Sequence, residues 1–127
     1  DCFLMEPGGG IRHFFFVISA PDRFPSEPLV CVPMTSISPD KNTDTACLVS
    51  PGEHHTCAHT SFIDYRRAVS IAVDQLDGFI QRAEAIPKPP PADPLFLQRL
   101  RDGAEESEFL IGDLSDILYR QGLIRPF

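Results

Sequence analysis

The sequence lacks any apolar run long enough to cross a bilayer. Its longest such run covers only residues 14–18, whereas a membrane-spanning helix needs about 20 consecutive apolar residues. The beginning of the chain also lacks the basic start and the long apolar stretch of a signal peptide. We therefore expect a soluble, cytoplasmic protein that makes no membrane contact.

Closely spaced cysteine pairs are absent as well. The four cysteines, Cys2, Cys31, Cys47 and Cys57, show no CxxC spacing and lie in or beside apolar runs. Free cysteine is among the most frequently buried residue types. This pattern predicts reduced thiols that pack in the core, and not a disulfide framework.

Basic residues are scarce. The chain has 11 Lys and Arg against 18 Asp and Glu, a net charge of -7. Non-specific binding of nucleic acid depends on Lys and Arg that neutralise phosphates, so this balance argues against it. Neither half of the chain forms a basic arm, and no internal repeat is visible. A nuclease would need a local positive patch, drawn from Arg12, Arg23, Lys41, Arg66 and Arg67.

What is present is enough for one domain. The chain has 127 residues, 43% of them hydrophobic. Short apolar stretches bounded by turn residues predict strands at residues 1–5, 12–19, 29–36, 45–49 and 68–73. A glycine-rich loop at 6–10 predicts a hairpin of the first two strands. Pro33 cannot donate to a sheet ladder, which predicts an edge or a bulge there. The pattern is typical of a small barrel or sandwich.

Helices are predicted in the second half, at 75–85, from 93–94 to about 101, and at 113–121. Asp74 and Asp93 are the expected N-caps, Gly122 the expected C-cap, and Ser61 is expected to cap one helical turn through Tyr65. The prolines at 87–91 favour a stiff spacer over a PxxP-type ligand. The predicted organisation is a small barrel or sandwich with a short helix at 1–85, a connector at 86–94, and helices at 95–127 that pack on it or on a partner.

Three of the four histidines fall within six positions. They are His54, His55 and His59, with Cys57 among them. Such donors suit a transition metal, and Glu53 or Asp64 could add oxygen. The spacing is poor for zinc, because one short cluster would need a ligand from elsewhere, such as Cys47 or His13. We favour an interpretation without metal, in which one or two histidines hold a loop through backbone hydrogen bonds.

Nucleophilic catalysis by Cys57 with His54 or His59 is a further alternative, because a neighbouring imidazolium lowers a thiol pKa. The sequence gives no signature of the oxyanion donor or the orienting group that such a pair requires. We therefore do not favour it.

Arg12 and Thr35 suggest a phosphate site. An arginine at the mouth of one strand and a hydroxyl at the end of the next can approach each other in a small barrel. Together they can grip a phosphodiester, because the guanidinium donors match its geometry. The plainer alternative is that Arg12 is a solvated flank and that Thr35 bonds to backbone.

Four segments carry a family resemblance. They read RHFFFVIS at 12–19, VCVPMTS at 30–36, CLV at 47–49, and Gly-Glu-His at 52–54 followed by His-Thr-Ser-Phe-Ile-Asp-Tyr at 59–65. In this order they resemble the MazF/PemK-like growth-inhibitor superfamily of toxin-antitoxin systems, and in particular a divergent branch. The likeness covers about residues 1–85.

The resemblance implies a mainly β, α+β chain: an SH3-like, partly open barrel of the MazF/PemK/CcdB type, usually homodimeric, here with a C-terminal helical extension. It casts Arg12 as charge stabiliser and Thr35 as the hydroxyl that positions phosphate. The family's Arg-Pro reads Arg12-His13 here, and an imidazole at that position can act as general acid or base.

The leading hypothesis is a metal-independent endoribonuclease that cleaves single-stranded RNA without a cofactor. Arg12, Thr35, His54 and His59 are its candidate catalytic residues, and a cognate antitoxin is the expected partner. One alternative is a non-catalytic interaction module that binds a protein through its groove or its C-terminal helices, which the acidic charge favours. A gyrase-directed inhibitor on the same fold is the other.

Overall fold

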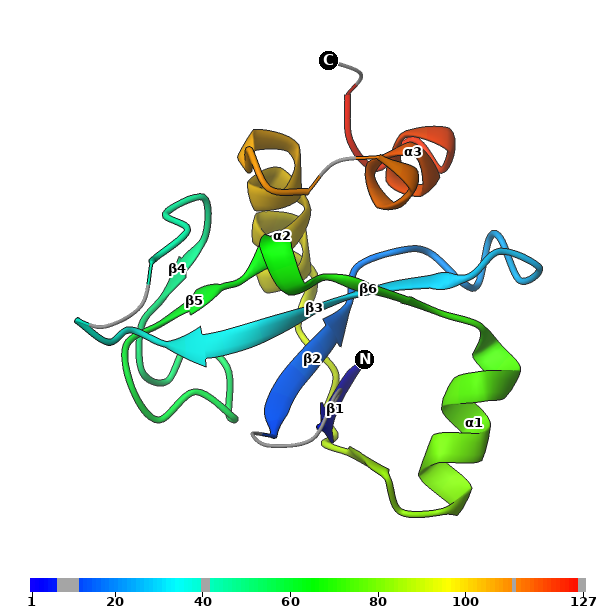
Figure 1. The fold of residues 1–127 in the computed structure, drawn as a ribbon, viewed down its shortest axis with the longest axis horizontal. Helices are drawn as coiled ribbons and strands as arrows, with labels where there is room; N and C mark the ends of the chain where they lie inside the picture. Colours follow the sequence, from blue (N-terminus) through cyan, green and yellow to red (C-terminus); the bar gives the residue numbers. More distant parts are fainter. Residues whose placement is uncertain (7–11, 40–41, 111, 126–127) are drawn as a thin grey trace.

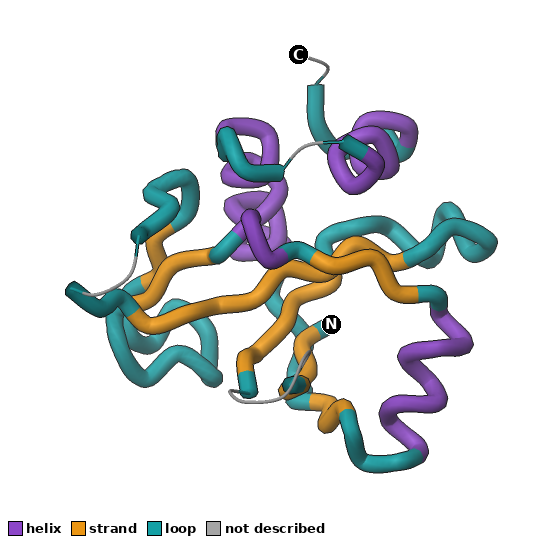
Figure 2. Tube along the Cα trace, in the orientation of Figure 1, coloured by secondary structure: helices purple, strands orange, loops and turns teal. Residues whose placement is uncertain are grey.

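The computed structural model describes residues 1–6, 12–39, 42–110 and 112–125 of the chain. Within them an antiparallel sheet has helices on both faces (Figures 1 and 2). Its strands are β1 (Cys2–Met5), β2 (His13–Val17), β3 (Leu29–Ser36), β4 (Leu48–Val49), β5 (Ser61–Ile63), β6 (Val69–Ile71) and β7 (Ala85–Pro87). The helices are α1 (Val73–Gln81), α2 (Pro94–Glu106), α3 (Asp113–Arg120) and the 3-10 turn η1 (Tyr65–Arg67). The predicted α+β class is confirmed.

The sheet is open. Its strands follow the order β4-β5-β3-β2-β1-β7, and β6 pairs with β3. The strands at the two ends of this path, β4 and β7, do not pair with each other in the described part of the chain. In this part of the chain the sheet is therefore not closed into a barrel, and the described residues form a seven-stranded sheet with three α-helices.

β3 is the central strand, and it changes partner along one edge. Its first half pairs with β6, where Leu29 faces Ile71, and its second half pairs with β5, where Met34 faces Ile63. Its other edge pairs with β2. The long β3 runs across the view in Figure 1, with β5 and β6 along it in succession.

Pro33 lies where this change of partner occurs. It is inside the central strand and not at an edge, so that part of the prediction was wrong. Its carbonyl accepts a hydrogen bond from the backbone N–H of Asp64, 2.9 Å away, just before η1. The backbone N and O of one strand residue point to the same side. The nitrogen of Pro33, which carries no hydrogen, therefore faces the gap between the end of β5 and the start of β6. No ladder bond is lost there.

Both faces of the sheet are buried, which explains the nearly continuous apolar strands. Side chains alternate along β2: Phe16 packs toward α2 and α3, and Phe15 toward α1. The first cluster joins Phe16, Ile18, Val30 and Val32 to Phe96, Leu100 and Leu118 of α2 and α3. The second joins Phe3, Phe15, Leu29 and Ile71 to Leu76 and Phe79 of α1.

The C-terminal helices begin and end largely as predicted. The Asp93 carboxylate accepts from the backbone N–H of Phe96 at 2.8 Å, and Pro94 occupies the first helical position. α2 continues beyond the predicted end, to Glu106. α3 ends at Arg120, and Gly122 has a φ of +72°, a conformation that glycine adopts readily.

Two predictions in the middle of the chain were wrong. Helix α1 is capped by Ala72 and not by Asp74, and it ends at Gln81, after which residues 85–87 pair with β1 as β7. Ser61 does not cap a helix but starts β5, between Ser36 and Val49. In both places pairing and packing against the sheet override the local capping signal.

The β1–β2 hairpin is confirmed, although residues 7–10 of its predicted glycine loop lie outside the described residues. All four cysteines are free and buried, as predicted. None of the described helices combines the length and the apolarity that a bilayer crossing requires.

Candidate functional site

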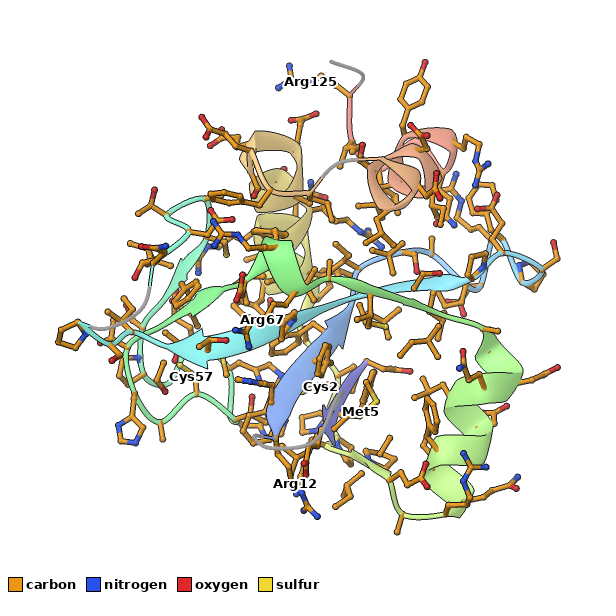
Figure 3. The ribbon with its side chains drawn as sticks, in the orientation of Figure 1. Cys2, Met5, Arg12, Cys57, Arg67 and Arg125 are labelled. Atoms are coloured by element: carbon orange, nitrogen blue, oxygen red, sulfur yellow. The ribbon has the colours of Figure 1, made fainter. Side chains whose placement is uncertain are left out.

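A polar pocket of about 250 Å³ lies where the start of β2, the end of β3 and the segment before β5 meet. Its lining residues are Arg12, His13, Phe14, Met34, Ser36, Thr56, Cys57, Ala58, His59 and Ser61. Figure 3 labels Arg12 beside the start of β2 and Cys57 in the segment that passes β3. The lining holds one guanidinium, two imidazoles and three hydroxyls, and none of these residues is acidic.

Arg12 supplies the fixed positive charge of this pocket. It directly precedes β2, its side chain is exposed, and it forms no ion pair with any residue that the structure describes. His13, the first residue of β2, faces Met5 across the hairpin. Arg12 and His13 therefore both belong to the part of the pocket lining that the hairpin forms.

The opposite wall is the segment between β4 and β5. Its turn is closed by the backbone N–H of Cys57, which donates to His54 O at 2.9 Å, and by Gly52 N–H, which donates to Cys57 O at 3.1 Å. The Ser61 hydroxyl donates to His59 O at 2.7 Å. These bonds hold the exposed His59 beside the end of β3.

Thr35 does not share this pocket. Met34 and Ser36 line it, and because successive strand side chains point to opposite faces, Thr35 points the other way. It pairs with Phe62 of β5 and is only 6% exposed, with no hydrogen-bond partner for its hydroxyl among the described residues. The expected grip of Arg12 and Thr35 on one phosphate is therefore not formed.

His54 is buried beneath the wall, with 6% of its surface exposed. Its ring stacks on Phe96 of α2 with centroids 5.6 Å apart, and it meets the edge of Phe16 at 4.9 Å. Burial lowers the pKa of His54 below its ordinary value of 6.5, and His55 lowers it further. His54 is thus a neutral side chain of the core, and it does not line the pocket.

The side chains of His55 and Cys57, in the same short cluster, have different hydrogen-bond partners. The His55 ring lies 4.3 Å from that of His54, and its Nε2 hydrogen-bonds with Pro90 O at 3.1 Å. The Cys57 thiol donates to His59 O at 3.1 Å and not to an imidazole. Among the described residues no group of three or more His, Cys, Asp or Glu side chains is placed to hold a metal ion.

Of the four candidate residues, the structure brings Arg12 and His59 together and places Thr35 and His54 elsewhere. The sequence interpretation missed the hydroxyls of Ser36, Thr56 and Ser61 as parts of the same pocket. One signal was available: the period of two along a strand puts Ser36, and not Thr35, on the face of Met34.

Comparison of the chain with models of known families, with curated proteins and with solved structures gave no match. The resemblance to MazF/PemK-like proteins therefore remains a prediction from the motifs at 12–19, 30–36, 47–49 and 52–65.

Proposed function

We propose that this protein is a metal-independent endoribonuclease whose active site is the pocket lined by Arg12, His13 and His59. The observation that carries the proposal is that Arg12, His13 and His59, from separate segments of an acidic chain, line one pocket that has no acidic lining residue. Because the chain has a net charge of -7, it can bind a phosphodiester only where positive charge is concentrated locally. Arg12 supplies such a charge in this pocket.

The side chains match the needs of RNA cleavage by the 2′-hydroxyl. One imidazole removes the 2′-hydroxyl proton as the 2′-oxygen bonds to phosphorus. The other donates a proton to the departing 5′-oxygen as the P–O5′ bond breaks. Arg12 stabilises the charge that develops on the phosphoryl oxygens. The products are a 2′,3′-cyclic phosphate and a free 5′-hydroxyl.

The Thr35 and His54 side chains have no direct part in this scheme. Both are buried away from the pocket, so neither can touch a substrate bound there. The exposed hydroxyl of Ser36 replaces Thr35 as the candidate donor to phosphate, because the Ser61 hydroxyl already donates to His59 O and the Thr56 hydroxyl already contacts His54 Nδ1.

The fold and the partner belong to the same proposal. The central strand β3, with β2 on one edge and β5 and β6 on the other, supports a relationship to the partly open SH3-like barrel. A toxin of this kind would act as a homodimer and be held inactive by a cognate antitoxin.

The test is cleavage of single-stranded RNA by the purified chain in EDTA. We expect cleavage, and we expect Arg12→Ala, His13→Ala and His59→Ala each to lower the rate by about 100-fold or more. Arg23→Ala is the matched control, because Arg23 is exposed in the turn after β2 and does not line the pocket. It should keep the wild-type rate.

Thr35→Val separates this proposal from the original pairing of Arg12 with Thr35. It removes a hydroxyl that is buried without a described partner, so the fold should tolerate it and the rate should not change. Intact RNA with every folded variant, the wild type included, would refute the nuclease. Growth inhibition without RNA cleavage would then favour a gyrase-directed inhibitor, to be checked by plasmid relaxation. The absence of both effects would favour the interaction module.

A further inference from the structure

His54 makes an unusual pair of contacts with the residue two positions ahead. Its Nδ1 lies 3.2 Å from the backbone nitrogen of Thr56, and the N–H points toward it. The Thr56 hydroxyl lies 2.7 Å from the same Nδ1. A backbone N–H can only donate, so Nδ1 is the acceptor of that bond and the proton of the neutral ring lies on Nε2, which is buried and has no hydrogen-bond partner among the described residues.

This bond sets the path of the pocket wall. Thr56 lines the pocket, and so do Cys57 and His59 just beyond it. The acceptor on Nδ1 and the turn bond from Cys57 N–H to His54 O together hold the chain where it bends toward β5. His54 thus acts on the pocket through Thr56, without entering the pocket itself.

A proton on Nδ1 removes the acceptor of the Thr56 N–H, although the Thr56 hydroxyl oxygen, 2.7 Å from Nδ1, can then accept from Nδ1–H. The added proton would set two donors, Nδ1–H and the Thr56 N–H, against each other at 3.2 Å. It would also place a positive charge on a ring that is 6% exposed and packed between Phe16 and Phe96. The lost bond from the Thr56 N–H and the burial of the charge therefore both oppose the closed position of the wall.

The charged groups around the ring differ in their effect. His55 disfavours an added proton on His54, and the Asp93 carboxylate at the start of α2 favours it. Arg99 lies over the far ring, Phe96, with its guanidinium carbon 5.9 Å from the centroid. From β1, the buried Cys2 has its pKa raised to about 11 and stays uncharged. Burial is the largest of these influences, and it favours the neutral ring.

We propose that His54 is a positioning residue whose neutral Nδ1 holds the pocket wall at residues 56–59, and that protonation of His54 opens this wall. The pocket is then a site that closes at neutral pH and loses its shape in acid. The inference deepens the proposed function, since it concerns the regulation of the same pocket, but its test does not depend on RNA cleavage.

The direction of the pH effect follows from the lowered pKa. Above the ordinary value of 6.5 the ring is neutral whether the wall is closed or open, so the closed wall keeps its full stability. As the pH falls below 6.5 the open wall takes up the proton more readily than the closed one, and the closed form is progressively lost.

The first test reads the ring of the wild-type protein. Nitrogen-15 shifts of the His54 imidazole near pH 7.5 should show Nδ1 without a proton and Nε2 with one. On acidification from about pH 8 to about pH 5, the amide signals of residues 56–59 should change together with the His54 ring. A proton on Nδ1 at neutral pH would overturn the inference without any variant.

His54→Asn is the decisive variant. An asparagine side-chain oxygen accepts from the N–H two residues ahead in an Asx-turn, so it replaces the Nδ1 acceptor without a titrating proton. The acid-dependent change at residues 56–59 should disappear in this variant and persist in the control His55→Gln, which removes the neighbouring, exposed imidazole. If His54→Asn keeps the wild-type transition, or if the wild-type wall does not respond to acid, His54 does not control the wall.

Activity alone would not decide the matter, because any histidine that takes part in the reaction makes the rate depend on pH. The NMR readout distinguishes the two failures. If the protein has no nuclease activity but residues 56–59 respond to acid through His54, the proposed function is refuted and this inference is supported. If the protein cleaves RNA but the acid response of residues 56–59 does not depend on His54, the proposed function is supported and this inference is refuted.

Discussion

Replacing Gly103 with alanine should destabilise the protein, although glycine is a poor residue for the interior of a helix. Gly103 lies in α2, where the helix crosses η1 and the loop before β4. A Cβ at this position would collide with the Tyr65 hydroxyl and stand 2.9 Å from the Cβ of Cys47. Tyr65 is 1% exposed, and its hydroxyl donates to Leu100 O at 2.7 Å. Neither neighbour can move into solvent.

Two destabilising effects and one stabilising effect set the size of the change in the free energy of unfolding. Overpacking of a core costs about 1–3 kcal/mol. Displacement of the Tyr65 hydroxyl from Leu100 O loses roughly 1 kcal/mol more. Alanine offsets about 1 kcal/mol of this through its better helix propensity. We therefore expect Gly103→Ala to lower the free energy of unfolding by about 1–3 kcal/mol, measured by urea denaturation.

Gly78→Ala in α1 is the matched control. The three described atoms nearest to its added Cβ all belong to the Arg82 side chain, and the nearest is a terminal nitrogen at 3.2 Å that can move away. This substitution should be neutral or stabilise the protein by up to about 1 kcal/mol. The double variant Gly103→Ala with Tyr65→Phe should lose less than the sum of the single losses, because Phe removes the colliding hydroxyl. Equal stabilities of the Gly103 and Gly78 variants would refute the close approach of α2 to η1.

Two further predictions concern local features of the fold. Asp93→Ala removes the acceptor for the Phe96 N–H and should lower the free energy of unfolding by about 1 kcal/mol, whereas Asp93→Asn should keep most of it; equal losses from both would show that the cap does not stabilise α2. Above about pH 9 the free energy of unfolding should fall as the pH rises, because burial raises the pKa of Cys31 from 9.0 to about 12 and the unfolded chain loses the thiol proton first. Thermal melts of Cys31→Ala should show a smaller alkaline slope; an unchanged slope would exclude this thiol as the source.

Local signals in the sequence predicted the elements that depend on neighbours along the chain. Asp93 and Pro94 start a helix because the cap and the fixed torsion act within one turn. Gly122 ends α3 for a similarly local reason. Asp74 failed as a cap because Val73 packs against the second apolar cluster, and the helix begins one residue before Asp74. Where burial opposed the local preference, burial decided.

The candidate site shows the same division. The sequence shows that Arg12 and His59 are polar residues at the ends of apolar stretches. Their common pocket, however, depends on the long-range pairing of β2, β3 and β5. Thr35 and Ser36 are neighbours in sequence, and only the register of β3 decides which of the two faces the pocket. His54 and His59 look equivalent in one short cluster, yet the docking of Phe96 on α2 buries the first and leaves the second exposed.

The sequence by itself determined the α+β class, the buried free thiols and the capped C-terminal helices, because composition and short-range geometry suffice for these. The tertiary structure decided that the sheet is open, that Pro33 lies in the central strand at a change of partner, and that Gly103 is required where Tyr65 approaches α2. These features depend on contacts between segments far apart along the chain, and such contacts leave no local pattern in the sequence.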